Sequence, residues 1–472
     1  MIRLHPCVPI LLALATLFAC GPPQGDDAGV SPRDAGATAA DAGPPGRQDG
    51  GRDGGGPTTR DGGLGDADGG SVDAGADADA GPRADAGNTT DAGATADGGT
   101  TADSGTGSDS GASIDAGPES LPPFDAGLCS HLKALASAEV SSGLTVGIAF
   151  SAQLPDGARC TGAAGLTALD GGLPMTATSL FRIGSVTKTF VAAVILELVD
   201  ENVLSLNDPV SKWLPTFTVG AVTIEQLLTH TSGLVDYLFD PTLQAQQSQP
   251  HTADQLYVIA SEQSGATAPG TWHYSNTNFL LLGRIIQAAT GQTWGSEVRR
   301  RILNRPELRL GSTFIDGFEP VPTPFVRGYQ DEGSGWVDQS ALTHPTVIDA
   351  AGCMVSSMVD LSRWWTALNT GRVFSPQALT AMRTHQVPVV AGQTWGLGVQ
   401  IQDGTPLGVL YGHGGGLGGY STQMQYFEGP GMTLTVAENI SLSVGDPLER
   451  VDPVTMVHRG IRPRLWQALL GF

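Results

Sequence analysis

Positive charge is scarce in this chain of 472 residues. It has 25 Lys and Arg against 47 Asp and Glu, so its formal net charge is −22 at pH 7. Lysine occurs at only three positions, Lys133, Lys188 and Lys212. A protein that binds nucleic-acid phosphates needs a basic face and gains affinity by releasing counterions. We therefore expect no nucleic-acid partner.

The N-terminal apolar run is too short to span a bilayer. It extends from Val8 to Ala19, follows Arg3 and is followed directly by Cys20. The end of this run, Leu-Phe-Ala-Cys, resembles the lipobox of bacterial lipoproteins, which implies cleavage before Cys20 and lipid on its thiol. An ordinary secretory peptide with a coincidental cysteine is the alternative. In both cases residues 1–19 are a signal peptide and the mature chain is exported. With the lipid, we expect it to be anchored in the bacterial cell envelope, at the outer membrane.

Aromatic residues are almost absent from the next segment. Residues 21–127 contain one, Phe124, together with 20 acidic and five basic side chains and a recurring Asp-Ala-Gly pattern. Asp recurs every sixth residue from 73 to 115, but a β-helix would need an apolar residue inside each coil. Too little apolar area is available to offset the loss of backbone entropy. We expect residues 20–127 to form a disordered stalk that precedes a folded domain over residues 128–472.

That domain has strand patterns near both ends and helical patterns between them. A helix is predicted over 129–139 and another over 463–470. Strands are predicted over 144–152, 158–165, 406–412, 422–427 and 432–437. This order predicts an α/β (α+β) domain whose sheet contains strands from both ends of the domain, interrupted by a helical insertion.

Cysteine is sparse, with five positions in the chain. In an oxidising compartment Cys129 and Cys160 could join the first helix to the second strand, but the sequence does not establish their geometry. Cys353 has no His or Asn arranged near it in the sequence, so we interpret it as a small buried residue and not as a nucleophile.

The candidate nucleophile lies at the start of an apolar helix. Ser185 and Lys188 are three residues apart, share one helix face and precede a run of apolar residues that ends near Val199. An amine whose charged form is disfavoured by burial can take the serine proton, and the helix dipole favours the alkoxide. The spacing alone is weak, because Ser130 and Lys133 match it too. We interpret that second copy as part of an ordinary amphipathic helix.

Two later segments favour Ser185. Tyr274 and Asn276 precede a helical pattern over 279–289, and in an extended segment both would point into one cleft. The alternative is that Tyr274 is a core aromatic and Asn276 an N-cap. The second segment, residues 411–419, contains His413 and six glycines. It fits the pattern G-x-G-x-x-G, but a strand follows it and not a helix, so it does not predict a dinucleotide site.

Together these motifs resemble the serine β-lactamase and penicillin-binding-protein superfamily, and within it the branch of class C β-lactamases, D-alanyl-D-alanine carboxypeptidases and esterases. The resemblance rests on Ser-Val-Thr-Lys at 185–188, Tyr-Ser-Asn at 274–276 and His-Gly-Gly at 413–415. Supporting stretches lie at 223–234, 327–329 and 351–357. The chain has no G-x-S-x-G motif, which counts against an α/β-hydrolase.

The resemblance implies a covalent acyl-enzyme on Ser185. Lys188 and Tyr274 would be the catalytic proton-transfer pair, Asn276 a substrate ligand, and the backbone amides of Ser185 and Gly416 the oxyanion hole. His230 and Thr231 would be structural. The implied fold is a five-stranded antiparallel sheet flanked by helices, beside an all-helical subdomain. No metal or organic cofactor is required.

One departure from the lactamase pattern affects the expected substrate. The chain has His413 and Gly415 where lactamases have the Lys and Gly of Lys-Thr-Gly. An uncharged imidazole is a poorer anchor for a substrate carboxylate. We therefore expect a small-molecule or peptide substrate, with esters or amides that lack this carboxylate preferred to β-lactams. A non-turnover module that senses cell-wall fragments or penicillin is the alternative.

Overall fold

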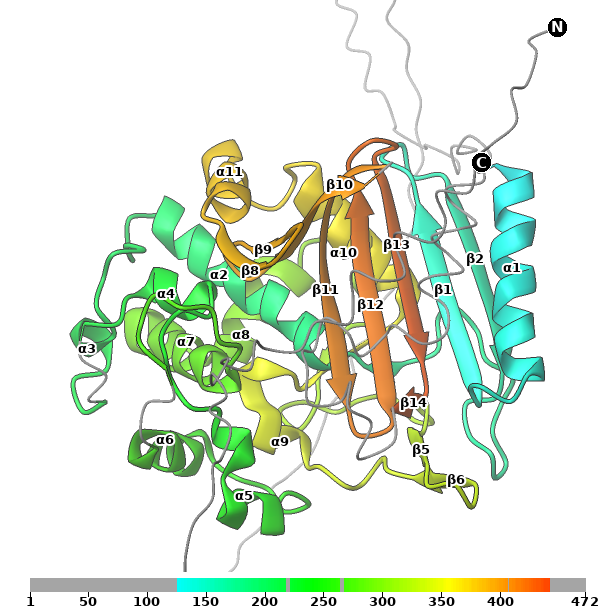
Figure 1. Cartoon of the computed structure of the whole chain (residues 1–472), viewed down its shortest axis with the longest axis horizontal. Coiled ribbons are helices and arrows are strands. Elements are labelled where there is room, and N and C mark those ends of the chain that lie inside the picture. The colour runs from blue at the N-terminus through cyan, green and yellow to red at the C-terminus, as the bar shows by residue number, and fades with distance from the viewer. Residues whose placement is uncertain (1–124, 218–220, 264–266, 406, 442–472) are drawn as a thin grey trace, which may run out of the picture. The chain divides into compact units, whose positions relative to one another are not determined.

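The computed structural model describes residues 125–217, 221–263, 267–405 and 407–441 (Figure 1). The expected signal peptide, Cys20, the expected stalk up to residue 124 and the helix predicted over 463–470 lie outside the described residues. Within the described ranges, no helix combines the length and the apolar character that a membrane crossing needs.

The central element is an antiparallel sheet, as the sequence predicted. Among the described residues it has eight strands in the order β2-β1-β13-β12-β11-β10-β9-β8 (Figure 1). Their bounds are β1 (Gly147–Gln153), β2 (Arg159–Gly165), β8 (Val387–Val390), β9 (Gln393–Trp395), β10 (Gln400–Thr405), β11 (Gly408–Leu417), β12 (Tyr420–Phe427) and β13 (Met432–Glu438). The strands of this sheet that come first and last in the sequence, β1 and β13, lie side by side, with Ile148 of β1 paired to Glu438 of β13.

Three strands extend the sheet beyond the five that the resemblance implied. β8, β9 and β10 continue it past β11, and the sequence pattern did not identify them because β8 and β9 have only four and three residues, β8 contains a proline, and β10 is mostly polar. The strand predicted over 406–412 also continues to Leu417. Its glycines are poor strand formers on their own, but β10 and β12 pair with β11 on both sides.

Two small sheets complete the strands of the described ranges. One is ordered β14-β5-β6, and the other is ordered β3-β7-β4. Their bounds are β3 (Phe181–Arg182), β4 (Phe314–Ile315), β5 (Tyr329–Asp331), β6 (Trp336–Asp338), β7 (Met354–Ser356) and β14 (Ile440–Ser441). Strand β3 of the second small sheet directly precedes the segment that carries Ser185, so its pairing with β7 helps to place the start of α2.

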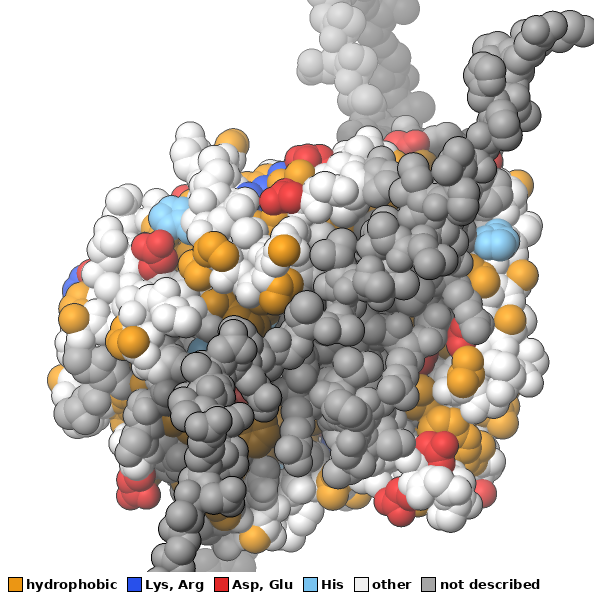
Figure 2. All heavy atoms as spheres, viewed as in Figure 1, with side chains coloured by type: hydrophobic (Ala, Val, Ile, Leu, Met, Phe, Trp, Pro, Cys, Tyr) orange, Lys and Arg blue, Asp and Glu red, His pale blue; other side chains and the backbone are white. Residues whose placement is uncertain are grey.

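Most of the helices lie beside one end of the sheet or against one of its two faces. Their bounds are α1 (Ala126–Ser141), α2 (Thr187–Asp200), α3 (Val210–Trp213), α4 (Ile224–Leu228), α5 (Pro241–Ala245), α6 (Ala253–Glu262), α7 (Asn276–Thr290), α8 (Trp294–Val298), α9 (Pro345–Ile348), α10 (Met358–Asn369) and α11 (Pro376–Thr384). Helices α3 to α8 gather beside the sheet, on the left of Figure 1, and α10 lies behind it. On the face shown in Figure 2, acidic side chains are more frequent than basic ones among the described atoms.

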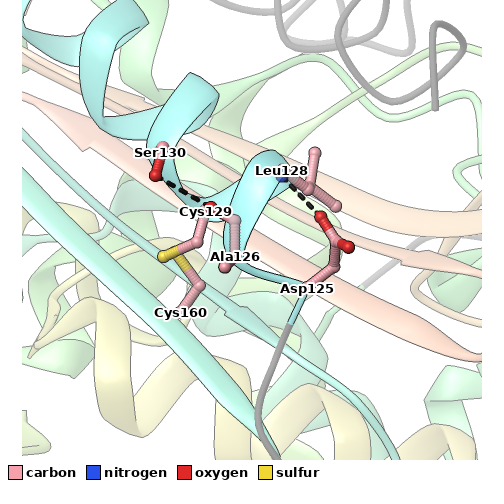
Figure 3. The surroundings of a disulfide bond; sticks show 6 residues. All are labelled: Asp125, Ala126, Leu128, Cys129, Ser130 and Cys160. Carbon is pink, nitrogen blue, oxygen red and sulfur yellow. Dashed lines mark hydrogen bonds between the residues drawn. A yellow bond between two sulfur atoms is a disulfide. The ribbon is translucent and has the colours of Figure 1, made fainter.

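The first helix begins earlier than the sequence predicted. It starts at Ala126 and not at 129, because the side chain of Asp125 caps it by accepting from the backbone N–H of Leu128 at 2.6 Å (Figure 3). The folded domain therefore includes at least residues 125–127, which the sequence assigned to the stalk. A disulfide joins Cys129 of α1 to Cys160 of β2, with 5.6 Å between the two Cα atoms. Cys353 is a buried free thiol, as expected.

The core between α2 and the sheet fixes the geometry of the site. Helix α2 is buried over nearly its whole length, and the ring of Phe190 stacks on Trp364 of α10 at 4.3 Å between centroids. The neighbouring indole N–H, that of Trp365, donates to the backbone oxygen of Tyr411 on β11 at 3.0 Å. Each fully buried side chain of this size contributes about 1.5 to 3 kcal/mol. Because α10 contacts both α2 and β11, it holds the helix that carries Lys188 against the strand that carries His413.

Candidate active site

Ser185 lies in a short 3-10 helix, η1 (Gly184–Val186), that leads directly into α2. Gly184 has φ of +50°, and a Cβ atom there would lie 2.9 Å from the backbone nitrogen of Gly416. Only glycine allows both this backbone conformation and this approach. The sequence therefore places a sharp turn against β11 immediately before the candidate nucleophile.

Ser185 contacts both residues of the predicted proton-transfer pair. Its Oγ lies 2.9 Å from Lys188 Nζ and 2.9 Å from Tyr274 Oη, which donates to it. Ser185 itself is half-buried, whereas Lys188 is fully buried. The structure therefore brings together three residues that the sequence separates by up to 89 positions.

Lys188 has two further hydrogen-bond partners. Its Nζ donates to Oδ1 of Asn276 at 2.8 Å and to the backbone oxygen of Ala351 at 2.6 Å. Burial lowers the pKa of Lys188 to about 7, and the negative charge of Asp236 opposes this shift. Neither oxygen can donate a hydrogen bond, so the two hydrogens of a neutral amine point to them. The remaining lone pair then faces Ser185 Oγ.

Tyr274 and Asn276 lie where an extended segment meets the start of α7. Ser275 is extended, with φ −146° and ψ 128°, and α7 begins at Asn276, three residues before the predicted start. Ser275 is therefore the N-cap residue, and the interpretation of Asn276 as an N-cap is wrong. The ring of Tyr274 stacks on His230 at 4.2 Å, and the Nδ1 of His230 accepts from the backbone N–H of Ser275 at 3.2 Å. His230 thus supports the tyrosine that contacts Ser185.

The glycine-rich end of β11 passes directly beside Ser185. A Cβ atom on Gly415 would collide with the backbone oxygen of Ile183 and would lie 3.2 Å from the backbone nitrogen of Ser185. With the approach of Gly416 to Gly184, this brings the Ser185 and Gly416 backbones together, as an oxyanion hole requires. The structure therefore places the backbone of Gly416 beside the turn at Gly184 that precedes the nucleophile.

His413 is fully buried and uncharged at neutral pH. Its Nδ1 lies 2.6 Å from the carbonyl oxygen of Gly414, to which it donates, so the neutral ring has its lone pair on Nε2. Burial, and to a smaller degree the charge of Lys188, lower the pKa of His413 to about 3. The edge of its ring faces Trp395, with 5.3 Å between centroids. His413 therefore provides no positive charge to the site.

Asp236 and the carbonyl of Ala351 were not among the site residues predicted from the sequence. Asp236 is buried and lies two residues after the stretch 223–234 that supported the family resemblance. Its Oδ2 accepts from the side-chain amide of Asn276 at 2.7 Å and from the backbone N–H of the same residue at 3.1 Å. A carboxylate next to that stretch was a usable signal. No sequence pattern indicates which backbone oxygen meets Lys188.

The second Ser-x-x-Lys segment lies elsewhere. Ser130 and Lys133 are exposed on α1, and the Ser130 hydroxyl donates to the backbone oxygen of Ala126 within the same helix at 2.8 Å (Figure 3). In the part of the chain that the structure describes, no group of three or more His, Cys, Asp or Glu residues is arranged to hold a metal ion.

The fold and the Ser–Lys–Tyr arrangement define a serine hydrolase of the β-lactamase type. A model of the beta-lactamase family matches residues 133–450, which is more than half of the chain. The protein belongs to this family. Its membership confirms the superfamily that the three motifs predicted.

Relatives of the chain include a penicillin-binding protein, an esterase and an amidohydrolase. Penicillin-binding protein 4* of Bacillus subtilis is 30% identical over 271 residues, which cover 53% of this chain and 58% of that protein. The chain thus spans little more than half the length of this relative. Esterase EstB of Burkholderia gladioli is 30% identical over 276 residues, covering 50% and 70%. A solved D-stereospecific amidohydrolase from Streptomyces sp. is 32% identical, with a TM-score of 0.58, over 67% of this chain and 95% of that one.

Proposed function

We propose that the protein forms an acyl-enzyme on Ser185 and cleaves esters or amides that lack a carboxylate beside the scissile bond, amides of D-amino acids among them. One observation carries the proposal: Ser185 Oγ lies 2.9 Å from both a fully buried amine and a phenol. A buried lysine with a pKa of about 7 is a general base at neutral pH, which an exposed lysine is not.

Acylation uses the lone pair of Lys188. Ser185 Oγ attacks the substrate carbonyl carbon and forms the new C–O bond while its proton passes to Lys188 Nζ. The electron pair of the carbonyl moves to its oxygen, which the backbone amides of Ser185 and Gly416 bind. When the carbonyl re-forms, the bond to the leaving group breaks, and the alcohol or amine takes a proton from Lys188 through Tyr274 Oη.

Deacylation runs the same steps with water. A water molecule attacks the ester carbon and gives its proton to the Lys188 and Tyr274 pair. The bond to Ser185 Oγ then breaks, the serine oxygen recovers a proton, and the carboxylic acid leaves. Asn276 acts as a ligand of the substrate in both halves of the cycle.

The substrate preference follows from His413. Its neutral ring, which donates from Nδ1 to Gly414, has only a lone pair on Nε2 and repels a carboxylate. β-Lactams and peptides that end in D-Ala-D-Ala have such a carboxylate. Two relatives fit this preference, since one is named an esterase and another a D-stereospecific amidohydrolase.

The test compares three substrates under one set of conditions. A chromogenic ester and a D-amino-acid p-nitroanilide are expected to give sustained rates, whereas benzylpenicillin turns over weakly or not at all. Intact-mass analysis after a phosphonate probe should place one adduct on Ser185, and Ser185→Ala should abolish it. Vigorous penicillin hydrolysis that survives His413→Ala would contradict the proposed preference.

The sensor alternative gives a different time course. The name of penicillin-binding protein 4* favours this second candidate, because a protein that binds penicillin need not turn it over. A sensor releases at most one equivalent of chromophore and then stops, whereas an enzyme continues at a constant rate. Product formation that stops at one equivalent with every substrate would contradict our proposal and support the sensor.

We also propose that the protein is exported and anchored through lipid on Cys20. The disulfide between Cys129 and Cys160 supports export, because such bonds persist in oxidising compartments and are rare in the cytosol of most organisms. In a bacterial host that processes lipoproteins, the wild-type protein should fractionate with membranes, and Cys20→Ser should release it. Wild-type protein in the soluble fraction would contradict the anchor.

A further inference from the structure

The buried carboxylate of Asp236 holds Asn276, which in turn contacts Lys188 of the proposed proton-transfer pair. Asp236 precedes the 3-10 helix η2 (Tyr237–Phe239) and lies against the first turn of α7. One of its oxygens, Oδ1, accepts from the backbone N–H of Leu238 at 3.0 Å. The other oxygen, Oδ2, accepts from the side-chain amide of Asn276 at 2.7 Å and from its backbone N–H at 3.1 Å. Every one of these partners is a donor, which is the arrangement that an ionised carboxylate needs.

The segment around Asp236 is tied to α7 and to α9 by further hydrogen bonds. The hydroxyl of Thr277 donates to the backbone oxygen of Val235 at 2.6 Å and accepts from the backbone N–H of Tyr237 at 3.0 Å. The Tyr237 hydroxyl donates to the backbone oxygen of Val347 at 2.7 Å. Asp236 is therefore held in place independently of its own contact with Asn276.

The carboxylate decides which end of the Asn276 amide faces the lysine. Because Nδ2 donates to Asp236, Oδ1 is the atom that remains for Lys188, at 2.8 Å. A flipped amide would place two donors, Nδ2 and Nζ, against each other. With Oδ1 in place, Lys188 gives its two hydrogens to Asn276 and Ala351, and its lone pair is left for Ser185.

Several charged or titratable groups surround Lys188. Asp236 lies beyond Asn276 and is the acidic group that raises its pKa. His413 on β11 and His230 after α4 are both buried, and burial holds the pKa of each imidazole below its usual value, so both are neutral at pH 7. Tyr274, before α7, contacts Ser185 from the other side. Burial raises the pKa of Asp236, whereas hydrogen bonds from Asn276 and Leu238 and the charge of Lys188 lower it and so favour the ionised carboxylate.

We infer that Asp236 is a positioning residue of this active site: it orients the Asn276 amide so that the lone pair of Lys188 faces Ser185. This inference rests on the proposed function of Ser185 and Lys188. Asp236 itself contacts neither the substrate nor the reacting atoms. It acts through Asn276.

The test is the pH profile of Asp236→Asn. This variant keeps the shape of the side chain and removes its charge, so Lys188 loses its proton at lower pH. We expect the acidic limb of kcat/KM to move down by about one pH unit. We also expect the plateau to fall by about ten- to a hundredfold, because the Asn276 amide is no longer fixed. Titration of 13C-labelled lysine by NMR gives the same shift directly, in a chain with only three lysines.

The matched control is Asp360→Asn. Asp360 is also a buried carboxylate, and it accepts from the backbone N–H of Ser312 at 2.6 Å and pairs with Arg363 at 3.0 Å, both away from Lys188. The Asp360→Asn variant should have a lower melting temperature and an unchanged acidic limb of kcat/KM. An Asp236→Asn profile whose plateau falls while its limb stays, or moves up, would show that Asp236 is only structural.

Two further measurements test the inference in case Asp236→Asn does not fold. Asp236→Ser removes the charge and keeps an acceptor for Asn276, so the same downward shift is expected. In wild-type protein, the side-chain N–H protons of Asn276 should exchange with solvent slowly, and exchange as fast as in an exposed asparagine would overturn the inference. Wild-type turnover that Ser185→Ala does not abolish would instead contradict the proposed function, so the two failures are distinguishable.

Discussion

Two segments of this chain have the same Ser-x-x-Lys spacing and opposite surroundings. Ser130 and Lys133 are exposed on α1, where the serine hydroxyl bonds its own helix. Ser185 and Lys188 stand where η1 meets α2, and there the lysine is fully buried. The spacing places a serine and a lysine on one helix face in both segments. Only burial, and the partners that come with it, makes that amine a base at neutral pH.

The sharpest way to test this comparison is to remove each hydroxyl in turn. Ser185→Ala should lower kcat/KM for a chromogenic ester by at least about a thousandfold, because no nucleophile remains to form the acyl-enzyme. Ser130→Ala, the matched control, should change it by less than about twofold, since that hydroxyl has only a local backbone partner. Equal losses in both variants would show that the site is assigned to the wrong serine.

Replacing each lysine by arginine tests the need for a removable proton. Lys188→Arg keeps a positive charge that cannot be lost at neutral pH, so we expect kcat/KM to fall by at least about a hundredfold. Lys133→Arg on the exposed helix should leave activity unchanged. Circular dichroism and melting curves on both variants check that they fold. A Lys188→Arg enzyme with wild-type activity would exclude Lys188 as the base.

The pH dependence of the wild-type enzyme should report the titration of Lys188. Its pKa is lowered to about 7 by burial, and the neutral form is the active one. We therefore expect kcat/KM to be constant above that pH and to fall about tenfold for each unit below it. Stopped assays across pH 5 to 9 measure the limb. A limb centred above pH 9 would mean that the amine is not desolvated in solution.

The segment around Ser130 and Lys133 should contribute to stability and not to catalysis, because Cys129, next to Ser130, forms a disulfide with Cys160. These cysteines are 31 positions apart, so Cys129→Ser is expected to lower the free energy of unfolding by about 3 to 4 kcal/mol. Urea titration measures this loss, and kcat/KM below the transition should stay at the wild-type value. Reducing agent should destabilise the wild type and have no further effect on the variant. A large loss of activity in the folded variant would contradict the separation of roles.

Much of the fold could be predicted from local pattern. Alternating apolar residues located β1, β2, β12 and β13 to within a few residues, and the apolar run after Lys188 located α2. The start of α7 was missed by three residues, because the N-cap Ser275 is followed by Asn276, a poor helix former that is held by Asp236. Strands β8 to β10 were missed because strands that are very short, contain a proline or are mostly polar are stabilised mainly by the neighbours that they pair with.

The sequence by itself determined that Ser185 and Lys188 share one face of an apolar helix, because the period of a helix is a local property. It also determined the three motifs that identify the family. The tertiary structure decided which of two identical spacings has a buried amine, that the carbonyl of Ala351 meets that amine, and that Asp236 fixes Asn276. These features arise from segments far apart in the chain, and the pKa of an amine depends on how completely such segments exclude water from it.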